Sequence, residues 1–147
     1  MHVLAQPLFA PRHLAGKNIG QLTVAACSAL AAGIHAWVVP EHYEEYTLFG
    51  VFFAMVAIAQ LGWAVAVVRA PSPWLFSAGI ALSAGVLAVW LLSRTAGVPV
   101  GPEPWEAEPA ALLDVVAGAA ELGIILVAGL SQRPAVRVAN RSRPAAR

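Results

Sequence analysis

Four long apolar runs constrain the fold of this chain more than any other feature. They cover residues 19–39, 47–68, 74–93 and 109–130, and each has about the 20 residues that an α-helix needs to cross a hydrocarbon core of roughly 30 Å. Only 12% of the 147 residues carry a formal charge, whereas an ordinary soluble domain has about 25%. The chain therefore lacks the polar side chains that cover a water-soluble globule, and we expect an integral membrane protein.

The composition of these runs favours helices over a transmembrane barrel. Ala, Leu, Val and Gly dominate them without the alternation of polar and apolar residues that barrel strands require. Proline-rich breaks separate them. The sequence predicts an all-α fold, a four-helix transmembrane bundle with up-down-up-down order over residues 19–130. A segment of residues 1–18 precedes it, and a basic tail of residues 131–147 follows it.

The basic residues predict how this bundle is oriented. Eight of the nine Lys and Arg residues lie before the first span, after the second or after the fourth, and Arg94 is the exception. Under the positive-inside rule, both termini are cytoplasmic in a multi-pass plasma-membrane protein, and the loops at 40–46 and 95–108 face outward. The tail is expected to bind anionic lipid headgroups. Because no aromatic residues interleave with its arginines, nucleic acid is not an expected partner.

A few polar side chains lie inside the predicted spans, where an ionisable group is costly unless it is paired or faces a cavity. Counted from the span ends at about 1.5 Å per residue, His35 and Asp114 share an outer layer. Gln60 and Glu121 share a deeper layer by the same count. Each of these residues is therefore a candidate functional residue.

The faces of the predicted helices give these residues a common direction. Pro40 is expected to begin the second helix, because a first helical residue needs no N–H donor. His42 would then lie on that helix and share a face with Gln60, while Asp114 and Glu121 share a face of the fourth helix. The two faces predict an outward-opening polar track lined by His35, His42, Glu45, Gln60, Asp114 and Glu121, with Arg94 at its mouth.

Imidazole and carboxylate groups are the ligands that transition metals accept, and helix bundles do build metal and haem sites. The leading hypothesis is therefore an outward-facing site for a transition metal (Cu, Zn or Fe) or haem. Its metal ligands would be His35, His42, Glu45 and Asp114. Gln60, Glu121 and Arg94 would contact the cofactor or orient its ligands.

Two alternatives come from other functional classes. In the first, the protein is an accessory or assembly subunit of a larger membrane complex, or a homo-oligomer, and its polar residues only hold helices together. Glu121 would then pair with Gln60, and Asp114 with His35 or Arg94. In the second, a small membrane enzyme acts on a lipid or isoprenoid through Asp114 and Glu121. That alternative requires a lipid-sized opening beside Asp114.

Three segments carry a resemblance to a known family. They are residues 34–53, IHAWVVPEHYEEYTLFGVFF, residues 60–63, QLGW, and residues 92–102, LSRTAGVPVGP. Together with the acidic start of the fourth span, they resemble a family of small four-span integral membrane proteins of high-GC Gram-positive bacteria, whose function is unassigned. The resemblance implies a plasma-membrane bundle and transfers no catalytic residue.

Overall fold

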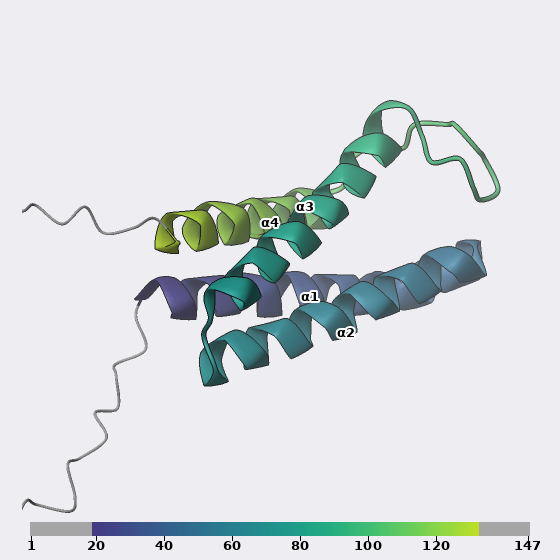
Figure 1. Cartoon of the computed structure of the whole chain (residues 1–147). Helices are drawn as coiled ribbons and strands as arrows, with labels where there is room; N and C mark the ends of the chain where they lie inside the picture. The colour runs from purple at the N-terminus through teal and green to yellow at the C-terminus, as the bar shows by residue number, and fades with distance from the viewer. Residues whose placement is uncertain (1–18, 133–147) are drawn as a thin grey trace, which may run out of the picture.

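The computed structural model describes residues 19–132, which form four α-helices (Figure 1). They are α1 (Ile19–Glu45), α2 (Thr47–Arg69), α3 (Pro73–Thr95) and α4 (Leu112–Ser131). Residues 19–132 contain no strand, and all four helices are long and apolar enough to cross a membrane. The predicted all-α four-helix membrane bundle is therefore confirmed. The predicted N-terminal segment and nearly all of the basic tail lie outside the described residues.

The helices do not pack evenly around a common axis. α1 packs between α2 and α4, and α3 packs on α4, whereas α2 and α3 touch only sparsely. Figure 1 shows α3 starting beside the end of α2 and then crossing the bundle at an angle, so that the two helices separate. The bundle is consequently closed at the end that holds the 70–72 link and parted at the other end.

The α1–α2 hairpin has a register that repeats every seven residues. The Gln21 side chain donates from Nε2 to the Val67 carbonyl over 2.8 Å, and the Ser28 hydroxyl donates to the Gln60 carbonyl over 2.9 Å. Seven residues are about two helical turns, so each such pair lies directly above the one before. Ser28 and Gln60 are each about 1% exposed, which places this polar seam between the two helices.

The end of α1 differs from the sequence-based expectation. α1 continues through Pro40 to Glu45, and only Tyr46 separates it from α2. The prediction that Pro40 begins the second helix is therefore wrong. A proline inside a helix leaves one carbonyl without its N–H partner, a defect that membrane helices tolerate. Here the last turns of α1 pack directly on the first turn of α2, because Gly50 lies against Tyr43 with no room for a side chain.

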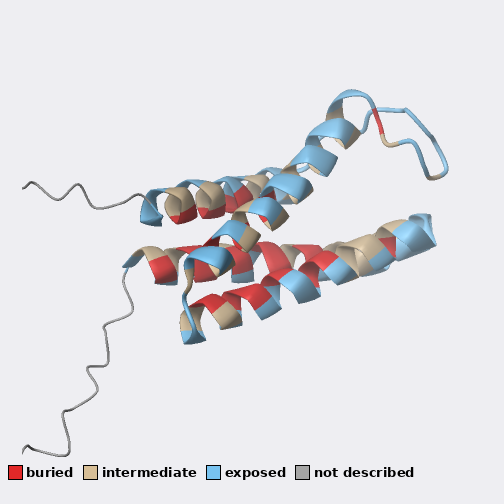
Figure 2. Cartoon of the chain, viewed as in Figure 1, coloured by how far each residue is buried: buried red, intermediate tan, exposed pale blue. Residues whose placement is uncertain are grey.

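The closed end contains most of the apolar core (Figure 2). Trp63 of α2 donates from its indole nitrogen to the Leu75 carbonyl of α3 over 2.7 Å, and its ring lies on Gly79. Ser72 caps α3 by accepting from the Leu75 amide over 3.2 Å. Around Trp63 lies a cluster of buried residues from all four helices, which includes Val24, Ala64, Val67, Phe76, Ile124 and Ala128.

We expect Gly79→Val to weaken this end of the bundle. A Cβ at Gly79 would overlap the Trp63 ring, and overpacking of this kind costs about 1–3 kcal/mol. Gly85→Val is the matched control on the same helix, because a Cβ there meets nothing within 4 Å. Unfolding of the purified protein in mixed micelles, followed by circular dichroism, measures both variants. Equal losses of stability would contradict the proposed tight contact.

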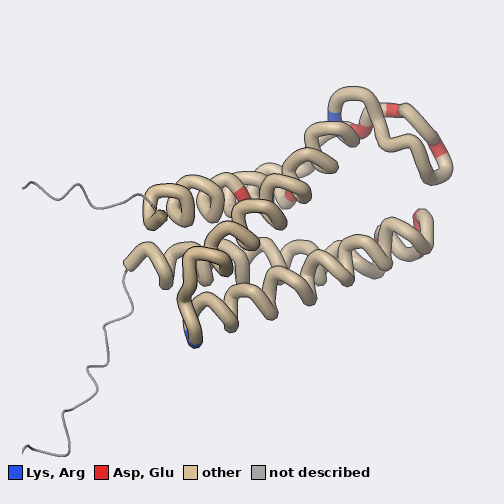
Figure 3. The backbone as a smooth tube through the Cα atoms, viewed as in Figure 1, with Lys and Arg blue, Asp and Glu red and all other residues tan. Residues whose placement is uncertain are grey.

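Charged residues are distributed unevenly between the two ends of the bundle (Figure 3). α2 ends with Arg69 at the closed end, which is also the end where α1 begins and α4 ends, while the acidic loop 96–111 lies at the parted end. We expect the parted end to face outward. In a Cys27→Ser background, a membrane-impermeant maleimide should label Glu103→Cys in intact cells. Ala70→Cys should be labelled only after permeabilisation, and the reverse pattern would overturn the orientation.

Candidate functional site

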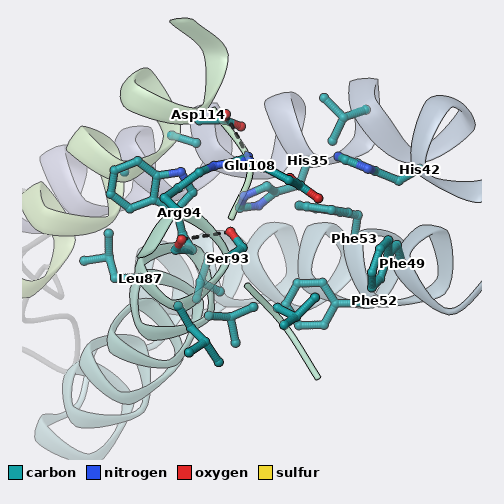
Figure 4. Close-up of a pocket in the computed structure, with 18 of the residues that line it drawn as sticks. His35, His42, Phe49, Phe52, Phe53, Leu87, Ser93, Arg94, Glu108 and Asp114 are labelled. Atoms are coloured by element: carbon teal, nitrogen blue, oxygen red, sulfur yellow. Dashed lines mark hydrogen bonds and ion pairs between the residues drawn. The ribbon is translucent and has the colours of Figure 1, made fainter. Parts of the chain in front are cut away.

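The parted end of the bundle contains a cavity of about 430 Å³. This volume is within the range of roughly 300–1,000 Å³ that is typical of small-molecule sites. Its walls are mainly apolar and come from all four helices and the 96–111 loop, with an aromatic group from α2 formed by Phe49, Phe52 and Phe53 (Figure 4).

Where α2 and α3 separate, three apolar residues that line the cavity are also partly exposed on the outside of the bundle. Leu48 of α2 lines it and is 51% exposed, and Val89 and Leu92 of α3 line it and are each 39% exposed. These residues lie where the two helices separate. An apolar molecule in the bilayer could therefore reach the cavity sideways, through an entrance with apolar edges.

A buried polar group lies at the floor of the cavity and joins three helices. His35 of α1 donates from Nδ1 to the Oε1 atom of Gln60 on α2 over 2.9 Å, and Gln60 donates from Nε2 to the Oε1 atom of Glu121 on α4. His35 is 5% exposed and Glu121 is not exposed at all. Because an amide oxygen only accepts, the proton of a neutral His35 ring is held on Nδ1.

The surroundings of Glu121 extend this floor to α3. The buried Ser83 of α3 lies beside the Glu121 carboxyl. Among the described residues, no group forms a well-aligned hydrogen bond with the second carboxyl oxygen, Oε2. His35 and Glu121 both line the cavity, whereas Gln60 lies behind them. Gln60 thus positions the two residues that face the cavity.

An ion cluster lies at the rim of the cavity, at the parted end of the bundle. Arg94, at the end of α3, donates from its two terminal nitrogens to Glu108 of the loop and to Oδ2 of Asp114, the latter over 2.9 Å (Figure 4). Asp114 also accepts from the Ala111 amide over 2.8 Å and thereby caps α4. One guanidinium faces two carboxylates, so the formal charge of the cluster is −1.

The loop covers the rim and contacts the opposite helix. Gly101 has a φ of +112° and lies against the Phe49 ring, where a side chain would clash. Val98 and Val100 of the same loop line the cavity. Since Glu108 is held by Arg94, the loop is fixed to α3 by charge and to α2 by packing.

His42 and Glu45 do not lie where the sequence predicted. Both are in α1, seven and ten residues after His35, and not on the second helix. His42 donates from Nδ1 to Glu45 over 3.1 Å and stacks on Phe53 with ring centroids 4.4 Å apart. His35 also contacts Phe53, at 5.6 Å. Both histidines therefore face the aromatic wall.

The predicted layers are also corrected by the length of α1. His35 was expected to share a layer with Asp114, but it bonds to Gln60 in the deeper layer. The depth count assumed a helix that ends at Val39, whereas α1 runs ten residues past His35. The predicted pairing of Glu121 with Gln60 is confirmed. Of the two partners considered for Asp114, the structure has Arg94.

The expected metal or haem ligands do not converge. Within residues 19–132, no three His, Cys, Asp or Glu side chains form a group that could hold a metal ion. His42 and Glu45 pair with each other, and Asp114 pairs with Arg94. The metal or haem site stays a prediction that the geometry does not favour.

Two buried polar residues were missed at the sequence level. Gln21 and Ser28 lie fourteen and seven residues before His35 and form the same face of α1. The signal was available in the spacing of Gln21, Ser28, His35 and His42, because each lies seven residues after the one before. Such spacing indicates a seam against a neighbouring helix.

Comparisons with known proteins leave the site to be interpreted from its own residues. No protein-family model matches the chain, and neither a curated protein nor a solved structure matches it.

We expect Gln60 and Glu121 to be energetically coupled. Gln60→Leu leaves the buried His35 and Glu121 side chains without their hydrogen-bond partner, and Glu121→Leu leaves the Gln60 amide without its acceptor. Each single substitution should therefore lower the free energy of unfolding by about 1–3 kcal/mol. The double variant should lose about 1 kcal/mol less stability than the two single variants added together, because it removes both partners of one hydrogen bond within the membrane. Reversible unfolding of the four proteins measures the difference, and simple additivity would contradict the pairing.

Proposed function

We propose that this integral membrane protein binds a membrane-dissolved amphiphile, a lipid or isoprenoid, that enters the cavity sideways between α2 and α3. The observation that carries the proposal is the cavity of about 430 Å³, with apolar walls, partly exposed apolar residues where α2 and α3 separate, and a buried polar floor. An amphiphile matches this arrangement, because its polar end can bind at the floor while its hydrocarbon chain fills the apolar space.

The energetics of packing favour a ligand bound in the cavity. Residues that line an empty cavity lose the dispersion contacts that a filled core would give them, and the loss grows with cavity volume. A hydrocarbon chain restores those contacts. In a bilayer such chains surround the entrance at high concentration, so filling the cavity requires no desolvation of an apolar molecule from water.

Two further observations separate this proposal from the alternatives. An accessory subunit with purely structural polar contacts has no need of an entrance lined by Leu48, Val89 and Leu92. An enzyme acting through Asp114 and Glu121 does require an opening at Asp114, and Asp114 lines the cavity. However, Asp114 is engaged by Arg94 and by the cap of α4. We therefore propose binding and assign no reaction.

A leucine at Gly118 tests the proposal by filling the cavity. Gly118 lines the cavity from α4, and a Cβ there would lie 3.7 Å from Leu87, which is an ordinary contact. We expect Gly118→Leu to remain folded and to lose several-fold in the labelling of the chain by a photoreactive fatty alcohol in nanodiscs.

The matched control for this substitution lies on the same helix. Gly129→Leu adds the same side chain near the closed end, where a Cβ meets nothing within 4 Å, and it should be labelled like the unmodified protein. Labelled peptides from the unmodified protein should map to α2 and α3. Equal labelling of both variants, or labels spread evenly over all lipid-facing surfaces, would overturn the proposal.

A further inference from the structure

The residues around the cavity indicate which class of amphiphile binds there, an inference that rests on the proposed function. We infer that the cavity binds an isoprenoid quinol, an uncharged aromatic ring with hydroxyl groups on a polyprenyl chain. Four observations lead to this ligand class: the depth of the floor, the charge of the rim, the free nitrogen of His35 and the aromatic wall.

The depth of the floor requires an uncharged polar end. His35 lies six residues before Glu41, the first charged residue in the last turns of α1, which corresponds to about 9 Å at the helical rise. A charged headgroup pulled that far from the interface loses its hydration, which costs several kcal/mol within a membrane. A hydroxyl or carbonyl group can be buried at this depth when it finds one hydrogen-bond partner.

The rim disfavours anionic ligands for a second reason. Among residues 19–132, Arg94 is the cation nearest the entrance, and both of its terminal nitrogens are engaged by Glu108 and Asp114. Its Nε atom has no partner among these residues but is covered by protein atoms. A phosphate or carboxylate headgroup would meet a cluster whose formal charge is −1. Anionic phospholipids and polyprenyl phosphates are therefore poor ligands for this site.

Two polar atoms at the floor lack a partner among the described residues, and one of them, Glu121 Oε2, is covered by protein atoms. The other is His35 Nε2. The His35 ring holds its proton on Nδ1 because Gln60 accepts there. Within the described residues, Nε2 has no partner, and the residue lines the cavity. The Nε2 atom of a neutral ring is an acceptor, so it matches a hydroxyl that donates. A quinol hydroxyl donates, whereas a quinone carbonyl only accepts.

The aromatic wall favours a planar ring over a branched headgroup. Phe53 already stacks on His42 with an interplanar angle of 13°, and Phe49 and Phe52 lie beside it at the cavity surface. Aromatic rings prefer offset or edge contacts with centroids about 4.5–7 Å apart, which a ring bound at His35 could make with this wall. The polyprenyl chain would leave through the α2–α3 entrance.

The test compares a short-chain menaquinol with the corresponding menaquinone in nanodiscs of a zwitterionic lipid, using the full chain. Quenching of tryptophan fluorescence reports binding, because Trp90 lines the cavity while Trp74 is 76% exposed at the other end of α3. We expect saturable quenching that Trp90→Phe removes and Trp74→Phe leaves intact. The quinol should bind roughly tenfold more tightly than the quinone, as expected for one hydrogen bond gained.

His35→Leu assigns this preference to Nε2. The variant should lose roughly tenfold in quinol affinity and bind the two redox forms equally. The preference of the unmodified protein is an independent readout, so the inference remains testable if the variant does not fold. Equal affinity for both forms in the unmodified protein, or a quinol preference that persists in a folded His35→Leu variant, would overturn it.

A brominated fatty alcohol separates this inference from the proposed function. If it quenches Trp90 selectively and the quinol shows no advantage over the quinone, the identification as a quinol site is wrong and the amphiphile site stands. If no ligand quenches Trp90 in preference to Trp74, both proposals are wrong.

Discussion

The Gln60 side chain is the interaction on which the arrangement of the other helices depends. Hydrocarbon offers no hydrogen-bond partners, so a buried amide must find both an acceptor and a donor within the protein. The Gln60 side chain finds its donor, His35, on α1 and its acceptor, Glu121, on α4. The backbone carbonyl of Gln60 accepts from Ser28. One residue therefore fixes α1, α2 and α4 relative to one another.

The third helix is held differently, and this difference creates the cavity. α3 is fixed to α2 at the closed end, where Trp63 bonds to Leu75 and packs on Gly79. At the parted end its ion pairs run from Arg94 to α4 and to the loop, not to α2. Because α2 and α3 bond to each other directly at the closed end and are linked at the parted end only through the loop, where Gly101 lies on Phe49, the two helices diverge. The space between them becomes the proposed entrance.

The apolar runs were sufficient to predict the number and the approximate limits of the helices. They were also sufficient to identify the buried pair Gln60 and Glu121, because polar residues at equal depth in hydrocarbon seek each other. The helix assignment of His42 failed, since Pro40 is a local signal for a helix start. The packing of Tyr43 on Gly50 extends α1 past it, and such a contact is visible only in three dimensions.

The cavity could not be predicted from hydropathy, because it depends on which small residues face which large ones. Its position nevertheless limits what the site can do. Asp114 is committed to Arg94 and the cap of α4, and one oxygen of Glu121 is committed to Gln60. Among the ring and carboxyl groups at the floor of the cavity, His35 has an Nε2 atom that no described residue engages and a tautomer that its bond to Gln60 defines. A single acceptor of this kind orients a hydroxyl but does not supply an acid and base pair, so the geometry favours selective binding over catalysis.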